Sequence, residues 1–181
     1  MSLNKLLNVL PAPTSPIETI TPDQWETFEL STGMSLPSDY KEYLGIFGTG
    51  VVGGVITPYN PFCKRTLLRA SYTCRNWMGQ AIAISRHKQQ FGTEVFPYPL
   101  YPEPDGVLPW GATDNGDQLF WLTTGSPNEW SVVINEVRSS IFEQFACSMT
   151  AFLHDLIIGN IQSKIIPHHC LDRDYIFEPL V

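Results

Sequence analysis

The sequence predicts a single α+β domain in which a mostly antiparallel sheet packs against several helices. Two segments with helical spacing lie before residue 50, strand-like segments follow one another within residues 108–146, and a last helical segment covers residues 148–159. Among the strands stands Asn115-Gly116, a dipeptide typical of tight hairpins. The chain has 181 residues, 43% of them hydrophobic, which is enough for one sizeable core.

The prolines near the start of the chain suggest where the domain begins. Three of them lie between positions 11 and 16, which predicts an irregular leader over residues 1–19. We expect the domain itself to span residues 20–160. Residues 161–181 are expected to form a tail that packs on the domain or extends it.

The sequence shows no recognisable targeting signal, and this observation together with the cysteine usage predicts a cytoplasmic location. The apolar run LLNVL is too short for a secretory signal, and no stretch is long enough to cross a bilayer. The four cysteines are far apart, without the density of a secreted disulfide scaffold. We therefore expect a cytoplasmic protein with reduced thiols.

The first helix of the domain is predicted to follow Thr21. Threonine is a favourable N-cap, Pro22 suits the first helical position, and Gly33 ends the pattern. The apolar face of this helix is expected to consist of Trp25, Phe28 and Leu30.

The second helix is predicted within SDYKEYLGIF, residues 38–47. Ser38 is able to cap it, and the charge of Asp39 is favourable near its N-terminus. Apolar side chains recur three to four residues apart and predict one buried face, made of Tyr40, Tyr43, Leu44 and Phe47.

The stretch GTGVVGG, residues 48–54, contains the spacing G-x-G-x-x-G of dinucleotide-binding loops. Such a loop must follow a strand and open a helix, so that phosphate meets free N–H groups. Here Gly48 and Gly50 follow a helix and lead into a strand-like run, where the helix presents carbonyl groups instead. The order therefore predicts a helix-exit turn and no bound nucleotide.

Residues 55–61 predict an edge strand, and residues 66–91 predict a long helix. Pro58 and Pro61 are compatible with an edge strand only. Residues 66–91 have helical spacing and lie in a segment, 61–93, that holds six Lys or Arg and no acid. Interleaved aromatics there resemble a nucleic-acid surface, but the net charge of −7 opposes such binding. We expect this helix to pair with the protein's own carboxylates and no nucleic acid to bind.

The second half of the chain predicts a loop, a meander of strands and a closing helix. PYPLYPEPD, residues 97–105, holds four prolines and is expected to be an extended surface loop. The strands LPWGA, QLFWLTT, WSVVINEV and IFEQFA follow, with a type I′ turn expected at Asn115-Gly116. The closing helix is predicted between Ser148 as N-cap and Gly159 as its end.

The arrangement of these motifs resembles the SUKH superfamily, which includes fungal regulators of cell-wall synthesis and many bacterial immunity proteins. The segments that carry the resemblance are WETFELSTGMSLPSDYKEYLGIFGTG, WGATDNGDQLFWLTTG and SMTAFLHDLIIG, in this order, over residues 20–160. The positions that match the family pattern are Trp25, Leu36, Pro37, Asp39, Tyr40, Gly48, Gly50, Gly116 and Asp117.

The resemblance implies a module that binds another protein, and two kinds of partner fit it. A bacterial member would neutralise a toxin, often a nuclease or a nucleic-acid deaminase, by occupying its surface. A member of the cell-wall regulator type would bind a cellular enzyme. An acidic surface favours a basic partner, although it also serves merely to keep a protein in solution.

Candidate contacts with a basic partner lie near the proline loop and the hairpin. They are Glu103, Asp105, Trp110, Asp114 and Asp117. A duller interpretation is available for each of them: the aspartates accept hydrogen bonds from turn N–H groups, and Trp110 belongs to the core. We expect a monomer, because prolines discourage pairing at an exposed strand edge.

The third hypothesis is that the protein is an enzyme, and the sequence contains few residues or motifs that support it. PHHCLDRD, residues 167–174, gathers metal-ligating residue types, but a structural zinc site normally draws on two separated clusters. The motifs G-x-S-x-G, Walker A and H-E-x-x-H do not occur. Asp114 and Asp117 lie in a solvated turn, where a raised carboxyl pKa is not expected. The sequence therefore predicts no catalytic residue, metal or cofactor.

Overall fold

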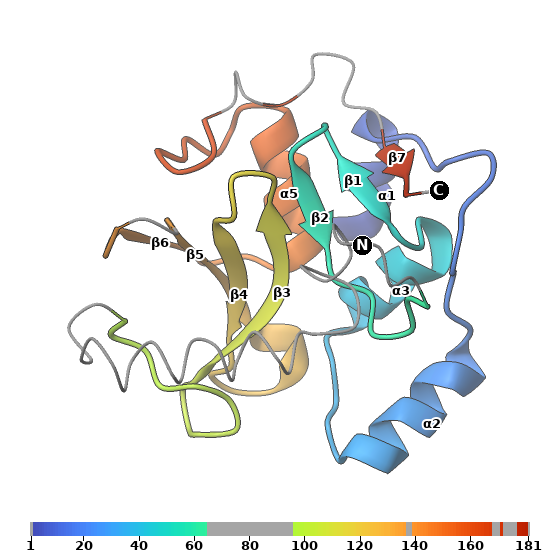
Figure 1. Ribbon diagram of the computed structural model, residues 1–181, viewed down its shortest axis with the longest axis horizontal. Helices are drawn as coiled ribbons and strands as arrows, with labels where there is room; N and C mark the ends of the chain where they lie inside the picture. Colours follow the sequence, from blue (N-terminus) through green and yellow to red (C-terminus); the bar gives the residue numbers. More distant parts are fainter. Residues whose placement is uncertain (1, 65–95, 137–138, 168–170, 172–176, 181) are drawn as a thin grey trace.

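A seven-stranded antiparallel sheet runs through the described part of the protein, in the order β6-β5-β4-β3-β2-β1-β7 (Figure 1). The computed structural model describes residues 2–64, 96–136, 139–167, 171 and 177–180. The strands are β1 (Gly50–Val52), β2 (Ile56–Pro58), β3 (Val107–Thr113), β4 (Gln118–Leu122), β5 (Ser131–Asn135), β6 (Phe142–Phe145) and β7 (Phe177–Pro179). The structure thus confirms the α+β class and the antiparallel pairing.

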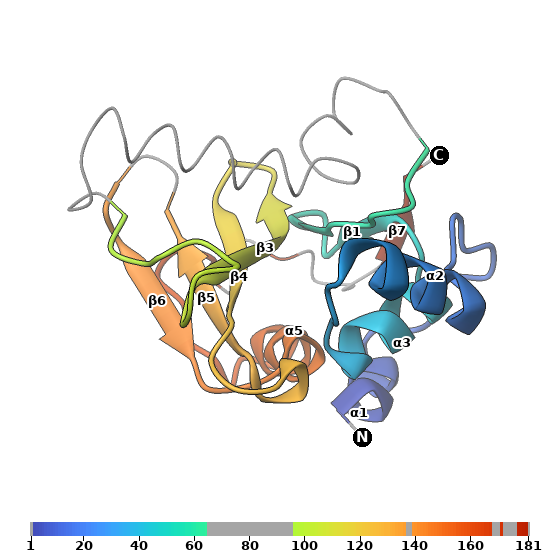
Figure 2. The ribbon, with the colours of Figure 1, turned by 90° about the horizontal axis from the view of Figure 1, so that it is seen from below.

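Helices cover one face of this sheet. They are α1 (Ser2–Val9), α2 (Pro22–Thr32), α3 (Ser38–Ile46) and α5 (Met149–Ile157), with a short 3₁₀ turn, η3 (Pro127–Glu129), before β5. Figure 2 shows α1, α3 and α5 gathered below the sheet, with α2 to one side next to α3. The main core lies between these helices and the sheet, and a smaller buried cluster on the opposite face contains Phe96, Val107, Phe120 and Val133.

The first residues of the chain are helical, so the expected irregular leader is wrong over residues 2–9. Leu3, Leu6 and Leu10 recur at helical spacing and are at most 4% exposed. A hydrogen bond of 2.6 Å between the hydroxyls of Ser2 and Thr150 joins α1 to α5. The prolines begin only at residue 11, after the helix has ended, and therefore do not interrupt it.

The predicted hairpin between β3 and β4 is present, but its turn differs from the expected one. Gly116 has a φ of 94°, whereas Asn115 keeps a negative φ, and Gly116 N–H bonds to the carbonyl of Thr113. This is a three-residue loop with glycine in the left-handed position. The type I′ turn lies between β1 and β2 instead, where Gly53 and Gly54 both have positive φ.

Strand β2 is internal, not the edge strand that the prolines suggested. It pairs with β3 along Ile56–Pro58 and with β1 at Ile56. Tyr59 donates its N–H to the carbonyl of Trp110 in β3, so the nitrogen of Pro58 faces away from β3. The residues of β1 that pair with β2 stop short of Pro58, and the missing N–H therefore costs no ladder bond.

The end of the described chain returns to the sheet. Strand β7 pairs with β1 along its whole length, with Gly50 opposite Pro179. The ring of Phe177 lies against Gly50, where a Cβ would come within 2.2 Å of it. Gly50 is thus required for this close approach.

Helices α3 and α5 begin without the serine caps expected from the sequence. Pro37 is the N-cap of α3, and the N–H of Ser38 is bonded by the side-chain amide oxygen of Asn128 at 2.8 Å. Ser148 makes no cap bond to α5. Asp39 of α3 accepts instead from the N–H and the hydroxyl of Thr150, both at 2.9 Å. A side chain from one helix therefore caps another.

Two further expectations concern loops. The proline segment folds into turns against the start of β3, where Tyr101 N–H bonds to Val107 and Val107 N–H bonds to Pro99. It is therefore more compact than an extended loop. The long basic helix expected at 66–91 lies outside the described residues.

Candidate binding site

Two of the predicted contact residues lie inside the protein. Trp110 is fully buried in the core, with its ring near Trp121 and Phe152. Asp117 is 6% exposed, and its carboxylate accepts a hydrogen bond of 2.9 Å from the hydroxyl of Thr113. Neither side chain is exposed enough to serve as a main contact for a partner. Trp110 is a core residue, whereas the hydrogen bond that Asp117 accepts from Thr113 comes from a hydroxyl and not from one of the turn N–H groups that were expected.

The other three predicted residues are exposed, but they do not form one surface. Glu103 and Asp105 precede β3, and Asp114 follows it. A seven-residue strand spans about 24 Å, so these carboxylates lie at opposite ends of the sheet. Asp105 also accepts a hydrogen bond of 2.8 Å from Thr124, which gives it a local role.

The family-motif positions in and before α3 build the hydrophobic core. Trp25, Leu36 and Tyr40 are each at most 5% exposed, and the ring of Tyr40 packs between those of Trp25 and Trp121. The hydroxyl of Tyr40 donates to the carbonyl of Tyr59 at 2.5 Å. These residues therefore fix α3 against the sheet.

Gly48, the first glycine of GTGVVGG, forms the turn by which the chain leaves α3. Gly48 has a φ of 66°, its N–H bonds to Leu44 at the end of α3, and a Cβ there would lie 1.9 Å from the carbonyl oxygen of Ile17. A φ in this region favours glycine. The helix-exit turn is confirmed.

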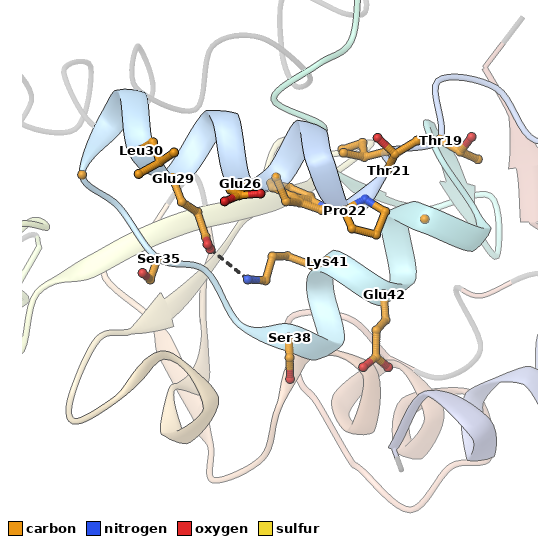
Figure 3. Close-up of a pocket in the computed structure, with 14 residues that line it drawn as sticks. Thr19, Thr21, Pro22, Glu26, Glu29, Leu30, Ser35, Ser38, Lys41 and Glu42 are labelled. Carbon is orange, nitrogen blue, oxygen red and sulfur yellow. Dashed lines mark hydrogen bonds and ion pairs between the residues drawn. The ribbon is translucent and has the colours of Figure 1, made fainter.

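A groove of about 950 Å³ lies between α2 and α3 (Figure 3). The two helices are linked by a short segment from Gly33 to Pro37, and the groove opens between them. Residues from both helices and from the segments before and between them line it: Thr19, Ile20, Thr21, Pro22, Trp25, Glu26, Glu29, Leu30, Gly33, Ser35, Ser38, Lys41, Glu42 and Gly45.

Capping and one ion pair hold the two helices in place. Thr21 and Gln24 form a reciprocal capping box at the start of α2. Glu29 of α2 accepts hydrogen bonds from Lys41 Nζ at 2.9 Å, drawn in Figure 3, and from the N–H of Leu36 at 3.1 Å. Burial raises the pKa of Glu29, but these hydrogen bonds and the charge of Lys41 outweigh it and hold the pKa below its usual range. Glu29 is thus ionised at neutral pH.

The surface of the groove is partly apolar and partly acidic. Ile20 and Trp25 are each 5% exposed, whereas Leu30 is 79% exposed. Glu26 and Glu42 are exposed and form no ion pair within the described residues. Three glutamates and one lysine line the groove, which gives it a net charge of −2. Such a surface suits a basic, partly apolar segment of a protein.

Sequence reasoning missed this groove, although part of it could be found. Leu30 was expected on the buried face with Trp25, but five residues place it about 140° around the helix. That angle predicts an exposed leucine. Glu26 and Glu29, three residues apart, share a side of α2. The position of α2 beside α3 depends on longer-range contacts such as that of Phe62 with Trp25.

Features that would indicate other classes of protein are not seen in the described part of the chain. There, no group of three or more His, Cys, Asp or Glu is placed to hold a metal ion. Most of PHHCLDRD lies outside the described residues. The helices that the structure describes are too short or too polar to cross a membrane.

Comparison with known families supports the arrangement of the core motifs. The model of the SUKH_6 family, described as SMI1-KNR4 cell-wall, matches residues 22–153. This range includes α2, α3 and the groove residues from Pro22 onward, together with the sheet from β1 to β6. No curated protein and no solved structure matches the chain significantly.

Proposed function

Because the chain belongs to the SUKH_6 family, we propose that it is an immunity protein, which binds a toxin and neutralises it by covering the toxin's surface. This family is one of protein-interaction modules, and the match to it is the observation that carries the proposal. The module has no catalytic function in this proposal and acts as a monomer in the cytoplasm.

The charge of the chain supports a basic toxin as partner. The net charge is −7, and Glu103, Asp105 and Asp114 are exposed at the two ends of β3. A nuclease or a nucleic-acid deaminase needs a basic cleft for its substrate, so an acidic inhibitor would associate with it rapidly. In this proposal the three carboxylates attract the toxin at long range.

The experiment that tests the function combines capture with rescue. The tagged protein is used to isolate partners from cells of its own source, and each partner is identified by mass and then expressed with and without the protein. We expect one stoichiometric partner with a basic domain that arrests growth alone and not in the presence of the protein. A partner whose toxicity persists under co-expression would contradict the proposal.

A second function is favoured by the description of the matching family, which refers to the cell wall. In that case the protein would regulate a cellular enzyme through the same kind of contact. Capture of an enzyme of cell-wall synthesis, with activity that changes on addition of the purified protein, would support this alternative over a toxin.

A further inference from the structure

We propose that the groove between α2 and α3 is the contact surface for the partner and that it receives a basic segment carrying a large apolar side chain. The inference rests on the proposed function in one respect, since it takes a protein partner as given. It adds the surface and the chemistry of the segment that binds there.

The apolar part of the groove provides the place for the apolar side chain. Ile20 and Trp25 line it as nearly buried side chains, and Leu30 of α2 lines it as an exposed one. Among the described residues Leu30 has the largest exposed fraction of any large hydrophobic side chain. An occupant that covers Leu30 removes this apolar surface from water, which favours binding.

The charges on the groove select a basic occupant. Lys41 is already paired with Glu29, so its charge is not available to attract an acidic segment. Glu26 lies on α2 and Glu42 on α3, where its carboxylate extends away from α2 (Figure 3). Neither carboxylate has an ion-pair partner among the described residues, so a segment that lies along the groove meets the charge of Glu26 on one helix and that of Glu42 on the other. A lysine or arginine before and after the apolar side chain would complement both.

The groove is preformed, which lowers the entropic cost of binding. The Glu29–Lys41 pair connects α2 to α3, and the hydrogen bond that Leu36 N–H donates to Glu29 connects α2 to the segment between the helices. Phe62, which lies outside α2, contacts the rings of Trp25 and Phe28 and so also holds this helix in place. Few protein groups need to become ordered when a segment binds.

A peptide selection tests the groove without knowledge of the natural partner. A displayed library of random 12-residue peptides is selected on the wild-type protein and counter-selected on the double variant Glu26→Lys/Glu42→Lys. We expect the enriched peptides to carry lysine or arginine on both sides of a Leu, Met, Phe or Trp. Enrichment of acidic or neutral peptides, or no enrichment, overturns the proposal.

A matched control separates the groove from general attraction to an acidic protein. Glu103→Lys/Asp105→Lys changes the net charge by the same amount at a distant surface. We expect a selected peptide to lose about tenfold or more in affinity on Glu26→Lys/Glu42→Lys and less than about threefold on the control pair. Equal losses on both pairs overturn the groove. All four positions are exposed, and the thermal midpoint of each variant verifies folding.

Two further measurements locate the peptide within the groove. Leu30→Ala keeps every charge and should weaken binding by about fivefold. The side-chain N–H resonance of Trp25, identified by its loss in Trp25→Phe, should shift on addition of the peptide, while those of the core residues Trp110 and Trp121 stay in place. A Leu30→Ala variant that binds like the wild type would overturn the apolar anchor.

The rescue assay then distinguishes the groove from the function. If the wild type protects cells and Glu26→Lys/Glu42→Lys does not, the groove is supported. If both protect equally, the groove is overturned and the immunity function stands. If the wild type itself gives no protection against the captured partner, the immunity function fails, and the peptide selection still decides the groove.

Discussion

Two tyrosines of α3 lie three residues apart, and their hydroxyls differ in their surroundings. The hydroxyl of Tyr40 donates to the carbonyl of Tyr59, whereas that of Tyr43 is buried with no partner among the described residues. Burial raises the pKa of Tyr43 well above its ordinary value, so the hydroxyl stays protonated. A buried polar group without a hydrogen bond costs stability.

Because the two hydroxyls differ in their surroundings, removing each of them by a Tyr→Phe substitution should affect the free energy of unfolding differently. Tyr40→Phe should lower the free energy of unfolding by about 1–2 kcal/mol, because it leaves a buried carbonyl without its donor. Tyr43→Phe should leave that free energy unchanged or raise it. Urea denaturation followed by fluorescence measures both. Equal losses in the two variants would mean that the hydroxyl of Tyr43 has a partner, such as a buried water molecule.

Cys147 is predicted to be a poor nucleophile. Burial, followed by the negative charges of Asp155 and Asp39, raises the pKa of its thiol to about 11. Thiolate is the reactive form, so alkylation by iodoacetamide at pH 8 should be about 100-fold slower than in the unfolded chain, where the pKa is about 8.5. Peptide mapping by mass spectrometry measures the rate at this one cysteine.

The same pKa shift has a consequence for stability. The unfolded chain ionises first as the pH rises, so the contribution of Cys147 is complete below about pH 8.5 and is lost as the pH approaches 11. Cys147→Ala should therefore lose less stability than the wild type over that range. An alkylation rate at pH 8 equal to that of the unfolded protein would contradict both expectations.

At the scale of elements, the start of α5 depends on a residue from α3. Asp39 and Thr150 are 111 residues apart in sequence, yet the carboxylate bonds both the N–H and the hydroxyl of Thr150. Asp39→Ala should lower the free energy of unfolding by about 1–2 kcal/mol, whereas Ser148→Ala, which removes the cap expected from sequence, should cost less than about 0.5 kcal/mol. Chemical denaturation of the two variants decides between the caps; a larger loss for Ser148→Ala would show that the local cap is the important one.

These elements also show what could be predicted from the sequence. The spacing of Tyr40, Tyr43, Leu44 and Phe47 predicted a buried helical face, and all four side chains are at most 3% exposed. Local signals such as Thr21 with Pro22 and Asn115 with Gly116 likewise predicted a helix start and a hairpin correctly. Each of these patterns involves only residues that are close together in the sequence.

Features that depend on distant residues were not accessible in this way. The internal position of β2 depends on pairing with β3, which residues 59–106 separate from it in sequence. The groove requires α2 to lie beside α3, and the cap of α5 requires α3 to lie beside α5. None of these arrangements has a local sequence signal, whereas the helicity of residues 2–9 does and was obscured by the prolines that follow.

At the scale of the whole molecule, α1 is part of the core although the family match begins only at residue 22. Leu6 is fully buried, so Leu6→Ala should lower the free energy of unfolding by about 2–4 kcal/mol. Leu30→Ala, at an exposed position, is the control and should change it by less than about 0.5 kcal/mol. A small effect of Leu6→Ala would mean that α1 is not needed for stability.

Each end of the described chain packs on elements that lie near the opposite end of the sequence. Helix α1 belongs to the first half in sequence but packs on α5 of the second, and β7 belongs to the second half but pairs with β1 of the first. During synthesis the edge of β1 beside Gly50 therefore stays open until residues 177–179 have been made, and α1 lacks its contacts with α5 until residues 149–157 have been made. The order in which the chain is made thus delays completion of the described sheet until β7 has been made.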